Sequence, residues 1–353
     1  MTVDLSALEQ PIVQAPLAGG ASTPELAAAV NSAGGLGFLA AGYKTAEAVA
    51  ADIAKLRSLT DAPFGVNLFA PPAPVVDRSI LDAYARELRA DARRYGAELG
   101  KPIHDDDDYA AKLELVREQR VQVVSFTFGC PDATVMQSLR GCGCDVWVTV
   151  TSPREALLAQ TAGATALVVQ GFEAGGHRGY FQDDPHTEDL GLIAALRLIA
   201  NSVELPLIAA GAICDGRAVA AVLCAGAVAA QIGTALMLAP EAGTSEPHRA
   251  ALATPACTGL TRAFSGRQAR GIVNRFMRDH GANAPAAYPD VHHMTTPVRA
   301  AARQAGDPDA INLWAGQTHS LARPAPAMEI VCTIGAEARE AAAALAARLA
   351  GPA

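Results

Sequence analysis

Residues 166–179 read Ala-Leu-Val-Val-Gln-Gly-Phe-Glu-Ala-Gly-Gly-His-Arg-Gly. The first four are all apolar, which is typical of a strand in a parallel sheet that is covered on both faces. The rest holds four glycines, one carboxylate, one imidazole and one guanidinium. Glycine lets the backbone approach a ligand closely, and an imidazole exchanges a proton near neutral pH. The stretch therefore predicts a buried strand that opens into an active-site loop, with His177 as the candidate catalytic residue.

Similar apolar runs recur along the chain and alternate with Ala-rich helical stretches. The predicted strands cover 11–16, 35–41, 64–69, 121–126, 145–151, 166–170, 206–211 and 227–234. Helices are predicted between most of them, at 24–33, 45–58, 131–140, 153–162, 189–201 and 215–225. Several begin with a capping Ser or Thr followed by Pro or an acidic residue, as in Thr23-Pro24-Glu25. Eight strands with intervening helices favour an α/β fold of the (β/α)₈ TIM-barrel type over an open doubly wound sheet, which seldom needs so many parallel strands.

Two regions interrupt this repeat, and they suggest how the chain is divided. We expect a barrel core over 1–239, in which 71–120 is an extended connection that partly covers the mouth. Residues 240–312 mix Pro, His and Arg irregularly and are predicted to form an inserted lid, a substrate-covering subdomain. Residues 313–353 then return to the barrel and include an Ala-rich helix over 335–349.

Composition excludes several classes of function. The chain has 353 residues, of which 50% are hydrophobic and 18% charged, and its net charge is −8. No basic cluster suits nucleic acid, no apolar stretch approaches the roughly 20 residues of a membrane span, and no signal peptide is apparent. Seven cysteines, including the closely spaced Cys142 and Cys144, are interpreted as reduced thiols of a cytoplasmic protein, with a redox dithiol as the alternative.

The ends of the predicted strands carry the features of a cofactor site. The seventh predicted strand ends at Gly211 and the eighth ends with Gly233 and Thr234, at the two strands where barrels often bind phosphate. Amides at the ends of the first, third and sixth strands, from Gln14, Asn67 and Gln170, suit the edge of a heterocycle such as a flavin. A Gly-x-Gly-x-x-Gly fingerprint does not follow any predicted strand.

Several segments of the chain resemble the nitronate monooxygenase family, formerly called 2-nitropropane dioxygenases. The similarity is carried, in chain order, by residues 11–17, 22–27, 126–131, 170–179, 206–211, 231–234, 266–271 and 314–317. The Glu-Ala-Gly-Gly-His-Arg-Gly run is the most specific of these, and the weakest coverage falls in 71–120 and 276–310. Two departures are the apolar Leu17, where the family commonly has Met, and Gly-Ala-Ile at 211–213 in place of Gly-Gly-Ile.

This resemblance implies a barrel with non-covalent FMN and a catalytic histidine at His177. It implies oxidation of alkyl nitronates, such as propionate 3-nitronate, by O₂ to a carbonyl product and nitrite. The implied partners are thus small molecules, and a homodimer is left open as the assembly. The FMN contacts carried over by motif are Ala15, Pro16, Leu17, Asn67, Gln170, Gly175, Gly211, Gln231, Ile232, Gly233 and Thr234.

Two alternatives stay open at this point. One is an NAD(P)H-dependent flavin reductase of the same barrel group, acting on an enoyl thioester or a quinone. The other is a non-catalytic phosphate- or nucleotide-binding barrel. A nitronate oxygenase reacts directly with O₂, whereas a reductase needs room for a nicotinamide.

Other polar residues receive secondary interpretations. Glu173 and Arg178 are expected to form an ion pair or to brace the loop. Ser125 and Thr127 are expected to point inward from the fourth strand and to line the pocket.

The covering regions contribute four further candidates for substrate contact, namely Tyr109, His292, His293 and Arg299. A metal site at His292 and His293 is not expected, because neighbours on a strand face opposite ways. The acidic run 105–108 is interpreted as a solvated turn before a helix rather than as a metal site.

Overall fold

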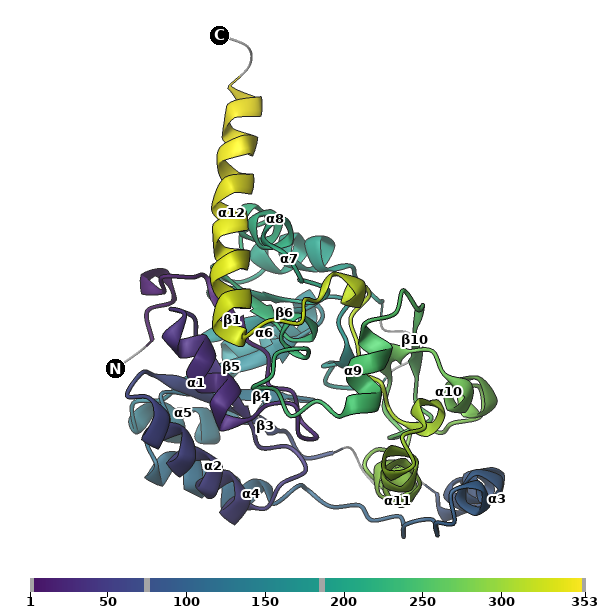
Figure 1. Cartoon of the computed structure of the whole chain (residues 1–353). Coiled ribbons are helices and arrows are strands. Elements are labelled where there is room, and N and C mark those ends of the chain that lie inside the picture. The colour runs from purple at the N-terminus through teal and green to yellow at the C-terminus, as the bar shows by residue number, and fades with distance from the viewer. Residues whose placement is uncertain (1–2, 73–76, 184–187, 351–353) are drawn as a thin grey trace.

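The computed structural model describes residues 3–72, 77–183 and 188–350 of the chain. Eight parallel strands form one sheet in the order β1-β9-β8-β6-β5-β4-β3-β2. A parallel bridge between Val13 and Leu36 joins the first and last strands and closes the barrel. Figure 1 shows the helices arranged around it. The predicted (β/α)₈ barrel is therefore confirmed.

The observed strands match the predicted ones closely. They are β1 (Ile12–Gln14), β2 (Gly37–Ala40), β3 (Phe64–Phe69), β4 (Val123–Thr127), β5 (Asp145–Val150), β6 (Ala166–Gln170), β8 (Leu207–Ala210) and β9 (Ala229–Ile232). The last strand ends before Gly233, whose backbone (φ −120°, ψ −72°) leaves the extended region, so Thr234 begins a 3₁₀ turn, η2 (Thr234–Leu236), rather than ending the strand.

Both faces of the strands are buried, as the continuous apolar runs predict. In β6, Ala166 and Val168 point into the barrel interior, where they pack with Trp147 and Phe38. Leu167 and Val169 instead join the larger cluster between the sheet and the surrounding helices. Alternate residues of one strand thus fill two separate cores, because successive side chains of a strand point to opposite faces.

Several helices of the barrel begin at the caps that the sequence indicates. They are α1 (Pro24–Ser32), α2 (Ala46–Leu59), α4 (Tyr109–Glu118), α5 (Ala133–Gly141), α6 (Pro153–Ala162), α7 (Leu192–Ala200) and α8 (Gly216–Cys224). The side chains of Thr23, Thr45 and Ser152 each accept a hydrogen bond from a backbone N–H in the first turn of the helix that follows.

A second group of elements packs beside the barrel around its own apolar cluster. It contains α9 (Glu246–Leu252), β10 (Thr258–Thr261), β11 (Ala269–Ile272), α10 (Arg275–His280) and α11 (Asp290–Gln304). Helix α3 (Arg78–Arg94), from the long connection after β3, joins this cluster and lies beside α11 (Figure 1). The cluster therefore draws on two distant stretches of sequence.

The loop after β6 is more ordered than predicted. Gly176 and His177 form a short strand, β7 (Gly176–His177), which pairs antiparallel with Ala269 and Arg270 of β11. A three-stranded sheet, β10-β11-β7, thus connects the barrel loop to the second group. Residues of two short strands that are far apart in sequence form this pairing, so no local pattern in 170–179 could indicate it.

Helix α12 (Ala327–Leu349) begins eight residues before the predicted start of the C-terminal helix. Its first half packs on α8 and α1, and its far end extends beyond the body of the protein (Figure 1). Within residues 3–72, 77–183 and 188–350, no helix is both long and apolar enough to cross a membrane.

Candidate active site

A cavity of about 380 Å³ opens at the carboxyl ends of the barrel strands, where (β/α)₈ enzymes place their active sites. Ten of the eleven predicted cofactor residues line it: Ala15, Pro16, Leu17, Asn67, Gln170, Gly175, Gly211, Gln231, Gly233 and Thr234. The eleventh, Ile232, is buried in the core between sheet and helices instead. His177 also lines the cavity. The structure therefore brings the predicted residues together at one site.

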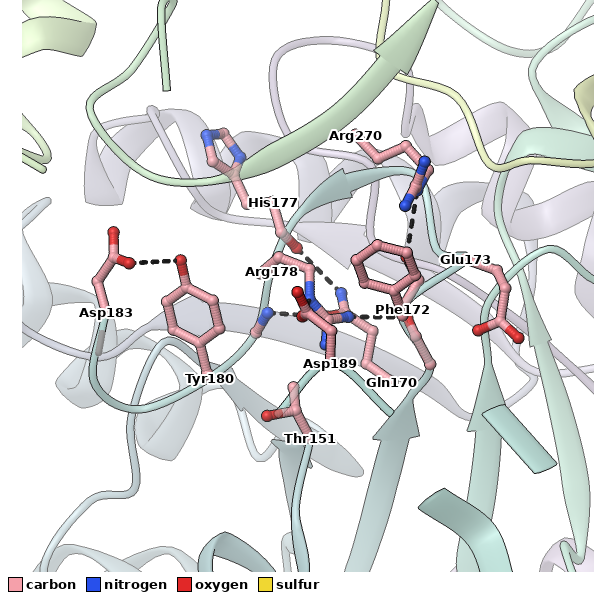
Figure 2. Close-up of polar contacts among 12 residues, drawn as sticks. Thr151, Gln170, Phe172, Glu173, His177, Arg178, Tyr180, Asp183, Asp189 and Arg270 are labelled. Carbon is pink, nitrogen blue, oxygen red and sulfur yellow. Dashed lines mark hydrogen bonds and ion pairs between the residues drawn. The ribbon is translucent and has the colours of Figure 1, made fainter. Parts of the chain in front are cut away.

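The amide of Gln170 organises the 170–179 loop (Figure 2). Its Nε2 donates to the carbonyl oxygen of His177 at 3.0 Å, and its Oε1 accepts from Arg178 Nη1 at 3.0 Å and from the Gly179 N–H at 2.8 Å. Gln170 lines the cavity, but both ends of its amide already have partners within the loop. We therefore assign it a structural role in shaping the strand end.

Glu173 and Arg178 brace the loop separately, which is the second of the two roles expected of them; they do not pair with each other. The Glu173 carboxylate accepts the Leu192 N–H at 3.0 Å, at the start of α7. Arg178 is buried, donates to the Gly171 carbonyl oxygen at 2.8 Å, and lies 3.5 Å from the carboxylate of Asp189. Figure 2 shows Glu173 on the opposite side of Phe172 from Arg178.

The imidazole of His177 points away from this bracing cluster (Figure 2). Its Nε2 lies 2.8 Å from the hydroxyl of Ser265, which is also 3.2 Å from the Arg267 carbonyl oxygen. The rings of Phe128, Tyr288 and Trp314 surround the imidazole at centroid distances of 5.3 to 6.0 Å. Burial, followed by the charges of Arg267 and Arg299, lowers the pKa of His177 to about 3. The imidazole is therefore neutral at pH 7.

Two arginines line the cavity, and no aspartate or glutamate of the described residues does. Arg299 is buried and Arg303 is exposed at the rim; both belong to α11. A third guanidinium, that of Arg267, lies just behind the wall, stacked 4.2 Å from the centre of the Phe128 ring and 4.8 Å from that of Tyr180. The cavity is therefore electropositive and suits an anionic ligand.

The glycines predicted to receive a phosphate lie at neighbouring strand ends, because β8 pairs with β9. Gly211 has φ of +140°, and Ala212 after it adopts φ of +51°, a left-handed conformation that is unfavourable for a residue with a Cβ. The Gly-Ala-Ile departure from the family therefore does not prevent the turn. Gly175 has a different reason to be glycine, since a Cβ there would lie 2.5 Å from the backbone of Ala315 and Gly316.

Some predicted contacts lie elsewhere. Gln14 does not line the cavity, because its Nε2 donates to the Phe38 carbonyl oxygen at 2.9 Å inside the barrel. Tyr109 packs against Phe126 on the barrel, and His293 pairs with Asp105 at 2.9 Å. The other two candidates of the covering regions, His292 and Arg299, do line the cavity. His292 and His293 belong to helix α11, so the premise that they are neighbours on a strand was wrong.

The inward orientation predicted for β4 is confirmed, but of its two polar residues Ser125 does not line the cavity. Asn67 Nδ2 donates to Ser125 Oγ at 2.9 Å and to Thr127 Oγ1 at 3.0 Å, and Thr127 lines the cavity. Tyr43, Ser265 and Phe128 are site residues that the sequence pattern did not predict. Tyr43 stacks on His292 at 4.1 Å and lines the cavity. Its position just after β2 could have indicated it, since strand ends surround the mouth of a barrel.

Metal and thiol chemistry receive no support from the described residues. No group of three or more His, Cys, Asp or Glu side chains among them could hold a metal ion. In the acidic run, Asp107 accepts the Tyr43 N–H and pairs with Lys112 at 2.8 Å. Cys142 and Cys144 are free thiols, and burial raises the pKa of Cys144 to about 11, which keeps it protonated and weakly nucleophilic.

Comparison with known proteins identifies the family to which the chain belongs. The model of the nitronate monooxygenase family matches residues 3–337. A nitronate monooxygenase of Pseudomonas aeruginosa is 42% identical over 95% of this chain and 98% of its own. The crystal structure of a nitroalkane oxidase from Streptomyces ansochromogenes superposes with a TM-score of 0.94, at 49% identity over 97% of this chain and 99% of the other.

A more distant likeness is to FabK from Thermotoga maritima. That structure covers 98% of this chain and all of its own, with a TM-score of 0.75 and 27% identity. Both its identity and its TM-score are well below those of the nitroalkane oxidase. The family resemblance carried by the 170–179 loop is thus confirmed, and the chain belongs to the nitronate monooxygenase family of oxidoreductases.

Proposed function

We propose that this protein catalyses the FMN-dependent oxidation of alkyl nitronates by O₂ to a carbonyl compound and nitrite. The observation that carries the proposal is the electropositive cavity, with arginines and no carboxylate among its described lining residues and a neutral His177. A nitronate is an anion, and its negative charge resides largely on the two nitro oxygens. Fixed donors and cations in a water-poor cavity stabilise such a charge.

The residues of the barrel mouth fit an FMN group. Gly211 and Gly233 end neighbouring strands, and Thr234 offers a hydroxyl group beside them, which suits a phosphate. The Thr244 hydroxyl, also in the cavity wall, is buried and has no hydrogen-bond partner among the described residues. A buried hydroxyl without a partner is unfavourable, so a polar ligand atom would satisfy it. The apolar Ala15, Pro16 and Leu17 would contact the ring system.

When bound, the flavin would supply the redox chemistry, accepting electrons from the substrate and returning them to O₂. The protein would hold the nitronate and control its proton. If the Ser265 hydroxyl donates to the Arg267 carbonyl oxygen, it accepts from His177 Nε2–H, and Nδ1 then carries the free lone pair. This Nδ1 would remove the α-proton from a neutral nitroalkane, and an imidazole that is neutral at pH 7 can act in this way without first losing a proton.

The test is to purify the protein, identify its bound cofactor by mass spectrometry, and supply nitronates in air. We expect bound FMN, O₂ consumption, and nitrite and carbonyl product in equal amounts. A protein that takes up no FMN would contradict the proposal and favour a non-catalytic barrel. A protein that binds FMN but forms no nitrite from any nitronate would favour the reductase alternative.

A further inference from the structure

Residues 265–268, which lie just before β11, hold the backbone that follows His177. The Gln268 carbonyl oxygen accepts the Arg178 N–H at 2.8 Å. The guanidinium of Arg267 donates to the carbonyl oxygen of Arg178 at 3.0 Å. The loop that carries His177 is therefore fixed by contacts from outside the barrel, and these contacts place the imidazole in the cavity wall.

Ser265 lies in a turn whose backbone is anchored on both sides. The carbonyl oxygen of Phe264 accepts the Thr295 hydroxyl at 2.5 Å, and that of Gly266 accepts a backbone N–H at 3.0 Å. Gly266 has φ of +81°, and a Cβ there would lie 2.4 Å from the Ala287 carbonyl oxygen, so this turn needs glycine. The Ser265 side chain is only 2% exposed. Its hydroxyl is therefore held in one place, which a side chain that positions another one requires.

The hydroxyl of Ser265 has three neighbours but only one proton. It accepts the Arg267 N–H at 3.4 Å, and it lies 3.2 Å from the Arg267 carbonyl oxygen and 2.8 Å from His177 Nε2. Among the described residues, no other donor reaches that carbonyl oxygen, and Arg267 is buried. Because a buried carbonyl group without a donor is costly, the proton of Ser265 goes to this oxygen. The second lone pair of the hydroxyl then accepts His177 Nε2–H.

From this geometry we propose that Ser265 is a positioning residue, which keeps His177 in the tautomer with a proton on Nε2 and a free lone pair on Nδ1. Nδ1 has no hydrogen-bond partner among the described residues, and His177 lines the cavity. When the substrate is a neutral nitroalkane, its α-C–H bond breaks, the proton binds Nδ1, and the electron pair stays on the substrate as the nitronate. The other tautomer would present an N–H to the cavity and could not accept this proton. The inference rests on the function proposed above.

The tautomer can be measured without any turnover, by NMR of the flavin-loaded protein with ¹⁵N-labelled histidine at neutral pH. Proton–nitrogen correlations distinguish a protonated ring nitrogen from a bare one, and the spectrum of His177→Asn identifies the signals of His177. We expect a proton on Nε2 and a bare Nδ1 in the wild type, and a mixture of both tautomers in Ser265→Ala. A proton on Nδ1 in the wild type, or an unchanged tautomer in Ser265→Ala, would overturn the proposal whether or not nitronates are oxidised.

The test of activity compares nitroethane with ethyl nitronate, which has already lost the α-proton. In Ser265→Ala, we expect kcat/KM to fall by about 10- to 100-fold for nitroethane, because a general base that is no longer oriented loses part of its contribution. For ethyl nitronate we expect a fall of less than about threefold, since no proton is removed from it. Equal losses on both substrates would overturn the proposal. A wild-type protein that oxidises ethyl nitronate but not nitroethane would overturn it too, and would leave the proposed oxidation of nitronates standing.

Two further variants complete the comparison. Ser265→Thr keeps a hydroxyl group beside His177 and should restore most of the turnover of nitroethane, which a purely steric role of the small side chain would not predict. Ser202→Ala removes a hydroxyl that donates to the Leu198 carbonyl oxygen at 2.9 Å and does not line the cavity, so turnover of both substrates should stay unchanged. If Ser265→Thr retains FMN and oxidises ethyl nitronate normally but is as poor on nitroethane as Ser265→Ala, the hydroxyl does not have the proposed role.

Discussion

The two walls of the cavity differ in what they are made of. The barrel wall offers strand ends, glycines and small or neutral side chains, such as Ala15, Gly211 and Gly233. The wall formed by the second group of elements offers rings and cations, among them His292, Arg299 and Trp314. The barrel wall can hold a cofactor through backbone amides, which every turn provides. The wall of the second group is made of side chains, which can be matched to one substrate. Substitutions on the two walls should therefore affect flavin content and substrate turnover separately.

The largest effect is expected at the junction of the two walls. His177→Asn should retain FMN, because the asparagine still fits beside Ser265 and the strand ends are unchanged. Turnover of a neutral nitroalkane should fall by about 100-fold or more, since a positioned general base contributes that much. Flavin absorbance and O₂ consumption measure the two quantities on one sample. Unchanged turnover would show that His177 is not the general base.

A substitution in the barrel wall should give the opposite pattern. In Gly233→Val, the Cβ would lie 3.1 Å from Leu17 Cδ2 and 3.2 Å from Ala15 Cβ, and the larger side chain would enter the cavity. We expect FMN affinity to fall by roughly tenfold, a typical cost of crowding a packed site. Titration of FMN into the apoprotein measures it. Gly141→Ala, at an open position on α5, is the control. An unchanged FMN affinity in Gly233→Val would contradict the assignment of the barrel wall to FMN.

The pH dependence of stability should depend on the neutral His177. Its pKa is about 3 in the folded protein, below the ordinary value of 6.5, so the unfolded chain binds the proton first as the pH falls. The contribution of His177 to the free energy of unfolding is therefore fully present above about pH 6.5. It decreases below that pH, by up to about 1.4 kcal/mol per pH unit. Between pH 7 and pH 5, the free energy of unfolding should fall by about 1–2 kcal/mol less in His177→Asn than in the wild type. Equal losses in urea titrations of the two proteins would show that folding does not lower the pKa of His177.

The smallest effect is expected where the connection 101–108 crosses α11. His104 lies 2.8 Å from Asp290, and Asp105 lies 2.9 Å from His293, so each segment supplies one histidine and one aspartate. The second pair is partly exposed, and a double-mutant cycle of Asp105→Asn and His293→Gln should give a coupling below about 1 kcal/mol. The cycle for His104 and Asp290 should give more, because Asp290 is buried. A larger coupling energy for the pair of Asp105 and His293 would show that burial does not determine the strength of these contacts.

The barrel could be predicted from sequence because its signals are local. Each strand is a short apolar run, and caps such as Thr23 and Ser152 mark the helix starts. The order of the strands in the barrel, and the edge at which the cavity opens, could be inferred from these signals. The second wall could not be predicted in the same way. The pairing of His177 with Ala269, the stacking of Tyr43 on His292 and the packing of α3 beside α11 join residues that are far apart in sequence. Local periodicity carries no information about such contacts.

Oxidation of nitronates in this cavity is tested most directly by an anaerobic comparison of electron donors. The flavin-loaded protein is mixed without O₂, in one sample with propionate 3-nitronate and in another with NADH, and the visible absorbance of the flavin is followed. We expect rapid bleaching by the nitronate and slow bleaching by NADH. Rapid bleaching by NADH with no response to the nitronate would contradict it and identify the protein as a reductase.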